Sequence, residues 1–338
     1  MSTREAGPEP PSIAEPASAP VSSGLDLKEL ASRSSLIWIW VLVALVFVII
    51  EPSTFLQSGT FKTIFGTQFE LVFLAVAIIC TFVVGEFDLS VAAILGLSAT
   101  LVPLLSVQEG WPVWLAVIAA ILASGAVGVM NAFVIVKIGV NAIVATLGMA
   151  TFVLGVTLWA TNLNAQDGLS ASFSQVALRS IFGLPIACYY GLAACVILTY
   201  VLVMTPLGRR MAFVGSSREV ARLAGINVNR IRFGAYVAGG LICGVGGVLL
   251  SASLGGFDPN TSGEYLLPAF AAVFLGTAVI TPGKFNPMGA FIAVYFLQTG
   301  IVGLELRGLT GWIEDVFYGG ALVLAVSATT IIQRRTAT

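Results

Sequence analysis

The sequence contains no histidine, and only 10% of its 338 residues are charged. Histidine is the commonest general base near neutral pH and a common metal ligand, so its absence argues against many acid–base enzymes and metal sites. A water-soluble domain carries about 25% charged residues. With 57% hydrophobic residues and a mean hydropathy of +0.98, the chain is predicted to be a polytopic membrane protein.

The chain is also poor in cysteine and in nucleotide-binding signatures. Its four cysteines, Cys80, Cys188, Cys195 and Cys243, lie in apolar runs without metal-ligand spacing, which is typical of small buried residues. The net charge of -1 leaves no basic footprint, so no nucleic-acid partner is expected. The only Gly-Lys pair is followed by Phe285 and lacks the upstream glycine of a phosphate-binding loop. We therefore expect no cofactor, no metal and no ATP binding by that route.

Ten apolar spans occupy the rest of the chain. They are 34–50, 69–84, 89–107, 111–136, 140–161, 181–205, 233–254, 267–281, 286–304 and 312–332. Most approach the roughly 20 residues that cross a bilayer core, whereas the second and eighth are short enough to be tilted, broken or shielded. The predicted fold is all-α, with about ten transmembrane helices, some of them broken. In the seventh span, Gly240 and Gly244 have the GxxxG spacing of closely packed helices.

Basic residues are distributed unevenly between alternate loops. With ten spans and an inner N-terminus, only Lys62, Arg179 and Arg307 of the 16 lysines and arginines lie on the outer side. Because basic residues favour cytoplasmic loops, both termini are predicted to be cytoplasmic. Residues 1–33 are expected to be a disordered or interfacial tail, 34–332 the transmembrane domain and 333–338 a short second tail.

A polar island, residues 206–232, carries six of those 16 basic residues. Ser216 and Glu219 have the spacing of a capping box, and Gly225 fits the left-handed residue that ends a helix. The pattern predicts a short amphipathic helix that docks a soluble partner, and a loop lying on lipid headgroups is the alternative. The candidate contact residues are Ser216, Arg218, Glu219, Val220, Arg222, Leu223 and Gly225.

The segment GEFDLSV, residues 85–91, interrupts the apolar runs with two acids and no base. Asp88 and Ser90 can cap the helix that follows, since a carboxylate there also favours the helix dipole. Alternatively, the interruption lines a solute path that Glu86 or Phe87 faces. Polar groups further along the chain either join helices or face the same path. The candidate path residues are Phe87, Asp88, Ser90, Asn131 and Asn141.

Four segments in order resemble ribose-type sugar ABC importer permeases, within the branched-chain amino acid and sugar permease family of binding-protein-dependent transporters. GEFDLSVAAILGLSA looks like the family's GGIDLSVG segment, and NAFVIVKIGVNAIVATLG resembles the N-G-x-x-V…T-L-G segment after it. RLAGINVNRIRFGAYVAGGLICGVGGVL is similar to its R-x-x-G-I-N loop and the glycine-rich span beyond. LLPAFAAVFLGTAVITPGKFNPMGAFIA looks like its A-I-A-A-V-V-L-G-G-T segment, without the paired glycines. Glu86 stands where the family usually has glycine.

The resemblance implies a permease of the bacterial inner (plasma) membrane that imports a sugar or similar small polar solute by alternating access. It also implies three protein partners in the lipid bilayer or beside it: a cytoplasmic ABC ATPase docked on 206–232, an extracytoplasmic substrate-binding protein, and a second permease copy or homologous permease. An ion-coupled secondary transporter using Glu86 and Asp88 remains the alternative. A membrane-embedded enzyme has little support, since the chain has no histidine.

Overall fold

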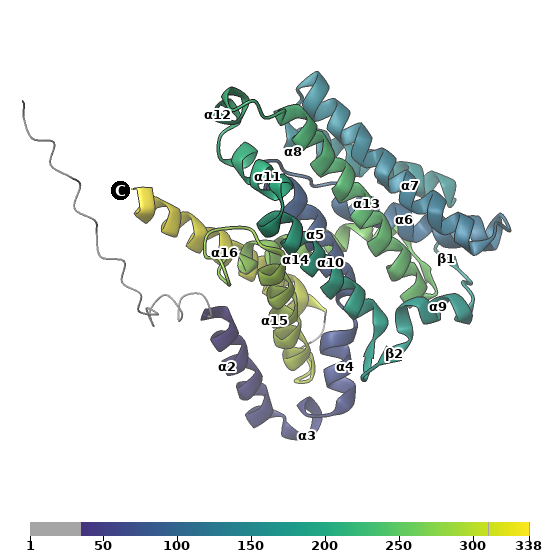
Figure 1. Ribbon diagram of the computed structural model, residues 1–338. Coiled ribbons are helices and arrows are strands. Elements are labelled where there is room, and N and C mark those ends of the chain that lie inside the picture. Colours follow the sequence, from purple (N-terminus) through teal and green to yellow (C-terminus); the bar gives the residue numbers. More distant parts are fainter. Residues whose placement is uncertain (1–34, 310, 338) are drawn as a thin grey trace, which may run out of the picture.

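The computed structural model describes residues 35–309 and 311–337 (Figure 1). The expected tail 1–33 lies outside the described residues. The helices are α2 (Ser35–Ile50), α3 (Pro52–Phe55), α4 (Ser58–Gly66), α5 (Phe69–Phe82), α6 (Val91–Pro103), α7 (Val113–Ala132), α8 (Ala142–Ala160), α9 (Ala171–Leu178), α10 (Ile186–Met204), α11 (Pro206–Ser216), α12 (Arg218–Leu223), α13 (Val228–Leu254), α14 (Leu266–Gly276), α15 (Pro287–Glu305) and α16 (Trp312–Ala337). Two π-helical turns, η1 (Leu104–Gln108) and η2 (Phe133–Ile138), extend α6 and α7, and η3 (Pro259–Tyr265) is a 3-10 helix.

The predicted all-α membrane fold is confirmed. Seven segments among the described residues are long and apolar enough to cross a membrane: Ser58–Phe82, Val91–Gln108, Val113–Ile138, Ala142–Ala160, Ile186–Met204, Val228–Leu254 and Pro287–Glu305. The count of ten spans and the cytoplasmic termini remain predictions. The first expected span is a shorter apolar helix, Leu36–Ile50, and the eighth is the 11-residue α14.

Helix α5 lies at the centre of the molecule, and all 14 of its residues are buried. A helix that is apolar on every side is stable only where other helices cover it. In Figure 1, α6, α7 and α8 lie on one side of α5 and α13, and α2, α14, α15 and α16 lie on the other. Of the three alternatives expected for the second span, tilted, broken or shielded, the structure shows a shielded helix.

Helices α7 and α13 approach each other closely because glycines lie at their contact. A Cβ atom added at Gly240 would lie 2.6 Å from the carbonyl oxygen of Ser124, and one at Gly128 would lie 2.6 Å from that of Tyr236. Gly244 meets Ser124 and the backbone of α7 in the same way. The close packing that the GxxxG spacing predicts is confirmed.

The loops gather at two ends, as the alternating topology requires. At one end, which we call the basic end, α12 lines a cavity with the 85–87 segment and the 139–143 turn, and α11 lines another with the 281–287 loop. At the opposite end, β1 (Gln166–Asp167) pairs antiparallel with β4 (Gly256–Phe257), and Arg307 bonds Glu51 at 2.8 Å. The small hairpin of β2 (Ser180–Ile181) and β3 (Leu184–Pro185) precedes α10 there.

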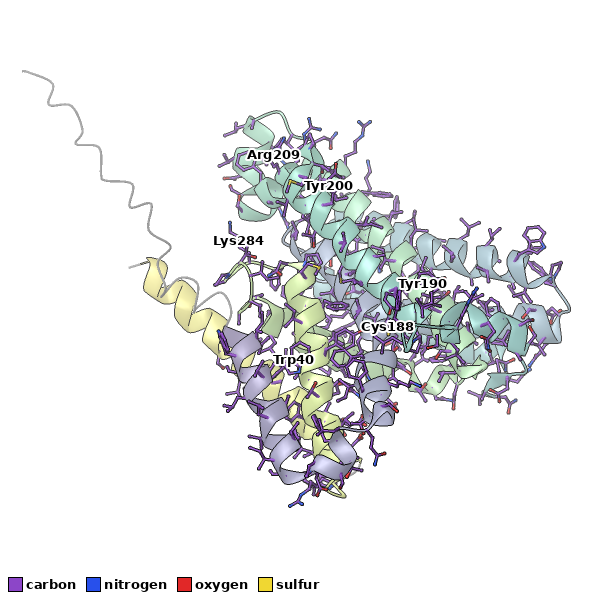
Figure 2. All side chains as sticks on the ribbon, turned by 60° about the horizontal axis from the view of Figure 1, so that its bottom comes forward. Trp40, Cys188, Tyr190, Tyr200, Arg209 and Lys284 are labelled. Atoms are coloured by element: carbon purple, nitrogen blue, oxygen red, sulfur yellow. The ribbon has the colours of Figure 1, made fainter. Side chains whose placement is uncertain are left out.

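Helix α10 links the two ends. In Figure 2, Cys188 and Tyr190 mark its start, while Tyr200 lies near its other end beside Arg209 of α11. Lys284 lies toward the same end as Arg209. All four cysteines are buried and unbonded to one another, as expected from their apolar surroundings.

Glycine at position 240 is expected to be essential for packing. Gly240→Ala forces a methyl group against the backbone of α7, so we expect a loss of about 1–3 kcal/mol in stability. The measurement is thermal denaturation of the purified protein in detergent. Gly234→Ala is the matched control on α13, because no atom lies within 4 Å of its added Cβ. A Gly240→Ala variant as stable as the control would contradict the packing.

Candidate functional site

A polar cavity of about 520 Å³ opens at the basic end. Three parts of the chain enclose it: the 85–87 segment after α5, the turn between α7 and α8, and the first residues of α12 and α13. Its lining residues are Gly85, Glu86, Phe87, Ile135, Val136, Gly139, Val140, Asn141, Ala142, Ile143, Arg218, Arg222, Asn229 and Arg232. A cavity that joins three segments far apart in sequence is the best-formed candidate site at this end.

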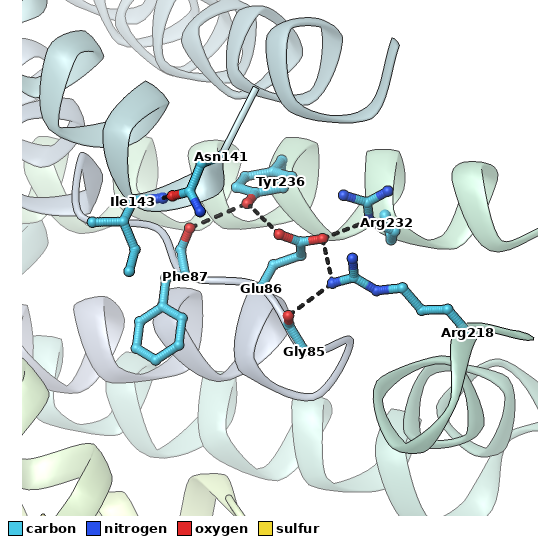
Figure 3. Close-up of polar contacts among 8 residues, drawn as sticks. All are labelled: Gly85, Glu86, Phe87, Asn141, Ile143, Arg218, Arg232 and Tyr236. Atoms are coloured by element: carbon cyan, nitrogen blue, oxygen red, sulfur yellow. Dashed lines mark hydrogen bonds and ion pairs between the residues drawn. The ribbon is translucent and has the colours of Figure 1, made fainter. Parts of the chain in front are cut away.

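The carboxylate of Glu86 is the centre of the cavity wall (Figure 3). Its Oε1 accepts hydrogen bonds from Arg218 Nη2 at 2.7 Å and from Arg232 Nε at 2.6 Å. The hydroxyl of Tyr236 donates to Oε2 at 3.3 Å and to the carbonyl oxygen of Phe87 at 3.1 Å. Only 4% of Glu86 is exposed. A carboxylate removed from water this completely requires such pairing, since an isolated buried charge is very costly.

The two arginines differ in their surroundings. Arg218 begins α12 and is 41% exposed, whereas Arg232 lies in α13 and is 11% exposed. Arg218 also donates to the carbonyl oxygen of Gly85 at 2.9 Å. Arg232 and Tyr236 are four residues apart on α13, so both side chains lie on the helix face turned toward Glu86. The polar island therefore neutralises Glu86, while the alternative that Glu86 or Phe87 faces a solute path stays a prediction.

Asp88, Ser90 and Asn131 form a second, fully buried group behind the cavity. Both the backbone nitrogen and the hydroxyl of Ser90 donate to Asp88 Oδ1, at 2.9 and 2.6 Å. Asn131 Nδ2 donates to Ser90 Oγ at 2.8 Å. Asp88 Oδ2 and Asn131 Oδ1 have no hydrogen-bond partner among the described residues. Burial raises the pKa of Asp88 above its ordinary value, although the bonds from Ser90 oppose this.

Phe87 and Asn141 are the candidate path residues that line the cavity itself. Phe87 is partly exposed, and its ring meets that of Phe82 edge-on with centroids 4.7 Å apart. Asn141 caps α8, since its Oδ1 accepts from the backbone nitrogen of Ile143 at 3.0 Å. The five candidates thus fall into two neighbouring groups. The hydroxyl of Thr146 in α8 accepts a hydrogen bond from the backbone nitrogen of Leu89 at 3.1 Å. This bond joins α8 to the interruption between α5 and α6, residues 83–90, which we call the break.

The island folds into two helices, where the sequence predicted one. Thr205 caps α11 by accepting from Gly208 N at 3.3 Å, and Pro206 occupies its first turn. This helix was missed, although a threonine followed by proline is a helix-start signal. One apolar cluster holds α11 and α12 against the rest of the protein. It contains Met211 and Val214 of α11 and Ala221 of α12, packed with Val84 and Val228.

The predicted capping box at Ser216 and Glu219 is wrong by one residue. Helix α12 begins after Ser217, whose hydroxyl accepts from Val220 N at 3.4 Å. Ser216 instead ends α11, where its hydroxyl donates to the carbonyl oxygen of Phe213 at 2.9 Å. Extending α11 to Ser216 leaves the next serine as the first extended residue, which is where a cap must lie.

The predicted stop at Gly225 is confirmed, with a φ of 77°. The backbone nitrogen of Ile226 closes the helix end by donating to the carbonyl oxygen of Ala221 at 3.0 Å. Within α12, Val220 is 49% exposed and Leu223 is 89% exposed, while Ala221 packs inward. Glu219 and Arg222 are also exposed. The helix therefore presents two apolar side chains between charged ones.

Arg232 and Tyr236 are the site residues that the sequence did not reveal. Their four-residue spacing places them on one face, but nothing local indicates that the face meets Glu86. Glu70 in α5 is a further buried carboxylate, and its Oε2 has no partner among the described residues.

Residues 61–326 match the family model described as branched-chain amino acid transport system, permease component. The ribose import permease of Bacillus subtilis is 34% identical over 250 residues, which cover 73% of this chain and 77% of that protein. The autoinducer 2 import system permease of Salmonella typhimurium is 31% identical, covering 72% and 74%. The L-arabinose ABC transporter permease of Azospirillum brasilense is 26% identical, covering 91% and 90%. No solved structure matches the chain significantly.

These relatives are transporter subunits and not enzymes, and none of them supports the ion-coupled alternative. Their names, the family match over most of the chain and the seven apolar helices agree with one another. The chain therefore belongs to the family of branched-chain amino acid transport system permease components, as a multi-pass inner-membrane permease subunit of an ABC importer.

Proposed function

We propose that this permease imports a sugar or similar small polar solute by alternating access, and that a separate cytoplasmic ABC ATPase hydrolyses the ATP. Relatives whose names give ribose, L-arabinose and autoinducer 2 support a small polar solute. The domain comprises residues 34–332, and the excess of basic residues at the basic end supports a cytoplasmic location for that end.

The observation that carries the proposal is the exposed surface of α12. Val220 and Leu223 project from a capped helix among charged residues, where a solvated loop would gain nothing from large apolar side chains. An apolar side flanked by charges fits a groove on a soluble partner, as amphipathic helices do elsewhere. We assign the ATPase contact to the segment 216–225 within the loop 206–232, with the exposed side chains of Val220 and Leu223 as the contacts, while Arg218 bonds Glu86 and Ser216 bonds the preceding turn.

The solute path is assigned to the cavity and the buried group behind it. Phe87 offers an aromatic face for the C–H side of a sugar, and Asn141 lies across the same cavity. Asp88 Oδ2 and Asn131 Oδ1 are acceptors with unused capacity, which suit hydroxyl donors that reach them during transport. Ser90 holds both groups in place.

We propose positions for the remaining partners at the end opposite the basic end and on α8. We assign the substrate-binding protein to the opposite end, on the segments around β1 and η3. Helix α8 has few buried residues, and its N-terminus borders the cavity on one side. A second permease copy, or a homologous permease, packed on α8 would enclose the path from that side.

Replacing Val220 and Leu223 together by Asp is expected to abolish ATPase binding, because it places two charges in the apolar contact. The measurement is co-purification of the ATPase, with import of radiolabelled ribose, L-arabinose, D-allose and autoinducer 2 into proteoliposomes. Membrane insertion of the variant is checked separately. If the double variant binds the ATPase and transports normally, residues 216–225 lie on lipid headgroups and the assignment is wrong.

The two neighbouring serines provide a matched pair. Ser217→Ala removes the cap of α12 and should destabilise that helix by about 1 kcal/mol, which weakens ATPase binding severalfold. Ser216→Ala removes only a bond to the preceding turn and should leave ATPase binding near wild type. Binding constants for the purified ATPase in detergent test this. Equal effects of the two changes would show that the cap is not important for docking.

Asp88→Asn tests the path. Asparagine keeps an acceptor for Ser90, so expression and thermal stability should remain near wild type. Loss of the carboxylate should lower import by roughly tenfold, because hydrogen bonds to charged groups contribute about 1.5–3 kcal/mol and those between neutral groups about 0.5–1.5 kcal/mol. Asp88→Ala, which removes the acceptor entirely, should also lower expression. Wild-type import by Asp88→Asn at normal expression would leave Asp88 a purely structural role.

A further inference from the structure

The bonds to Glu86 join the surface helix α12 to the break between α5 and α6. Arg218 is the first residue of α12, and its guanidinium contacts both the Glu86 carboxylate and the Gly85 carbonyl oxygen. The next residues along the chain, Phe87 and Asp88, are those assigned to the solute path. Only one residue therefore separates an ATPase-facing helix from the proposed path.

The end of α11 packs directly on the same segment. A Cβ atom at Gly215 would collide with the carbonyl oxygen of Val83 and lie 3.3 Å from Gly85 N. Val84 is buried in the apolar cluster that includes Met211 and Val214 of α11. With no compliant side chain between the two backbones, a shift of α11 and α12 must displace residues 83–86, since close-packed contacts transmit displacement.

Glu86 also fixes the position of α13 relative to the break. Arg232 and Tyr236 approach the carboxylate from α13, and Tyr236 bonds the carbonyl oxygen of Phe87 as well. One buried side chain thus connects a surface helix, a core helix and the interrupted backbone. Bonds between separate elements can be kept or broken as those elements move, and transmitting a conformational change requires an element of this two-state kind.

We infer that Glu86 is the positioning residue that couples movement of α12 to the shape of the break. Through Arg218 it passes the displacement of the ATPase-facing helix to Phe87 and Asp88, while Arg232 and Tyr236 fix the direction in which the break moves. The inference rests on the proposed function. It adds the connection between the ATPase contact on α12 and the solute path at Phe87 and Asp88.

Two variants interrupt this link at different points. Arg218→Gln cuts the connection to α12 and leaves Glu86 paired with Arg232. Glu86→Gln combined with Arg232→Gln removes the buried charges as a pair, which avoids leaving one charge unpaired inside the protein. Arg230→Gln is the control, since Arg230 is an exposed member of the same island whose side chain is not among the bonds to Glu86.

The experiment uses the full chain reconstituted with its ATPase and binding protein. The probe is whichever of ribose, L-arabinose, D-allose and autoinducer 2 the wild-type complex imports. We measure bound ATPase and the number of solute molecules imported per ATP hydrolysed. Both link variants should keep the ATPase bound, while import per ATP falls roughly 2- to 30-fold. Arg230→Gln should match wild type in both measurements.

The ratio separates coupling from stability, because a merely destabilised protein lowers the amount of active complex without changing import per ATP. A wild-type ratio of import to ATP hydrolysis in the Glu86→Gln/Arg232→Gln variant would overturn this inference and leave the proposed function standing. A normal ratio in Arg218→Gln would do the same for the link to α12. A wild-type preparation that binds no ATPase would overturn the proposed function and this inference together.

Discussion

A buried carboxylate must be neutralised, and the basic end of this protein is organised by that requirement. Glu86 is held by Arg218 and Arg232, which come from segments about 130 and 150 residues away along the chain. Removing one partner of a buried pair typically costs about 3–5 kcal/mol, so the pair with Arg232 fixes where the start of α13 lies, and the more exposed Arg218 adds a weaker bond from α12. The cavity beside Glu86 exists because these three segments converge there.

The close contact of α7 with α13 makes this convergence possible. Glycines at 128, 240 and 244 let the two backbones approach, and Tyr236 projects from the same part of α13 toward Glu86. In a membrane, helix association depends on van der Waals packing and on interhelical hydrogen bonds more than on the hydrophobic effect. The glycines therefore set the distance between α7 and α13, and the hydrogen bonds to Glu86 form at that distance.

The all-α membrane fold was predictable from the sequence, because long apolar runs are local signals. The stop at Gly225 was also predictable, since a left-handed residue after a helix favours glycine. The cap was misplaced by one residue because Ser216 and Ser217 offer the same local chemistry, and only the length of α11 decides between them. The partners of Glu86 could not be predicted, because pairing across some 150 residues depends on how α13 packs.

The two polar groups of the site differ in where their hydrogen-bond partners lie. Asp88 and Ser90 hydrogen-bond each other within the break, and Asn131 of α7 donates a further bond to Ser90. Glu86 is satisfied only by residues of other helices, and its bonds change whenever those helices shift. In the coupling that we infer, the locally bonded group moves as a unit while the bonds of Glu86 to other helices change. Such an arrangement allows a transporter to move its path residues without unfolding the helix ends that hold them.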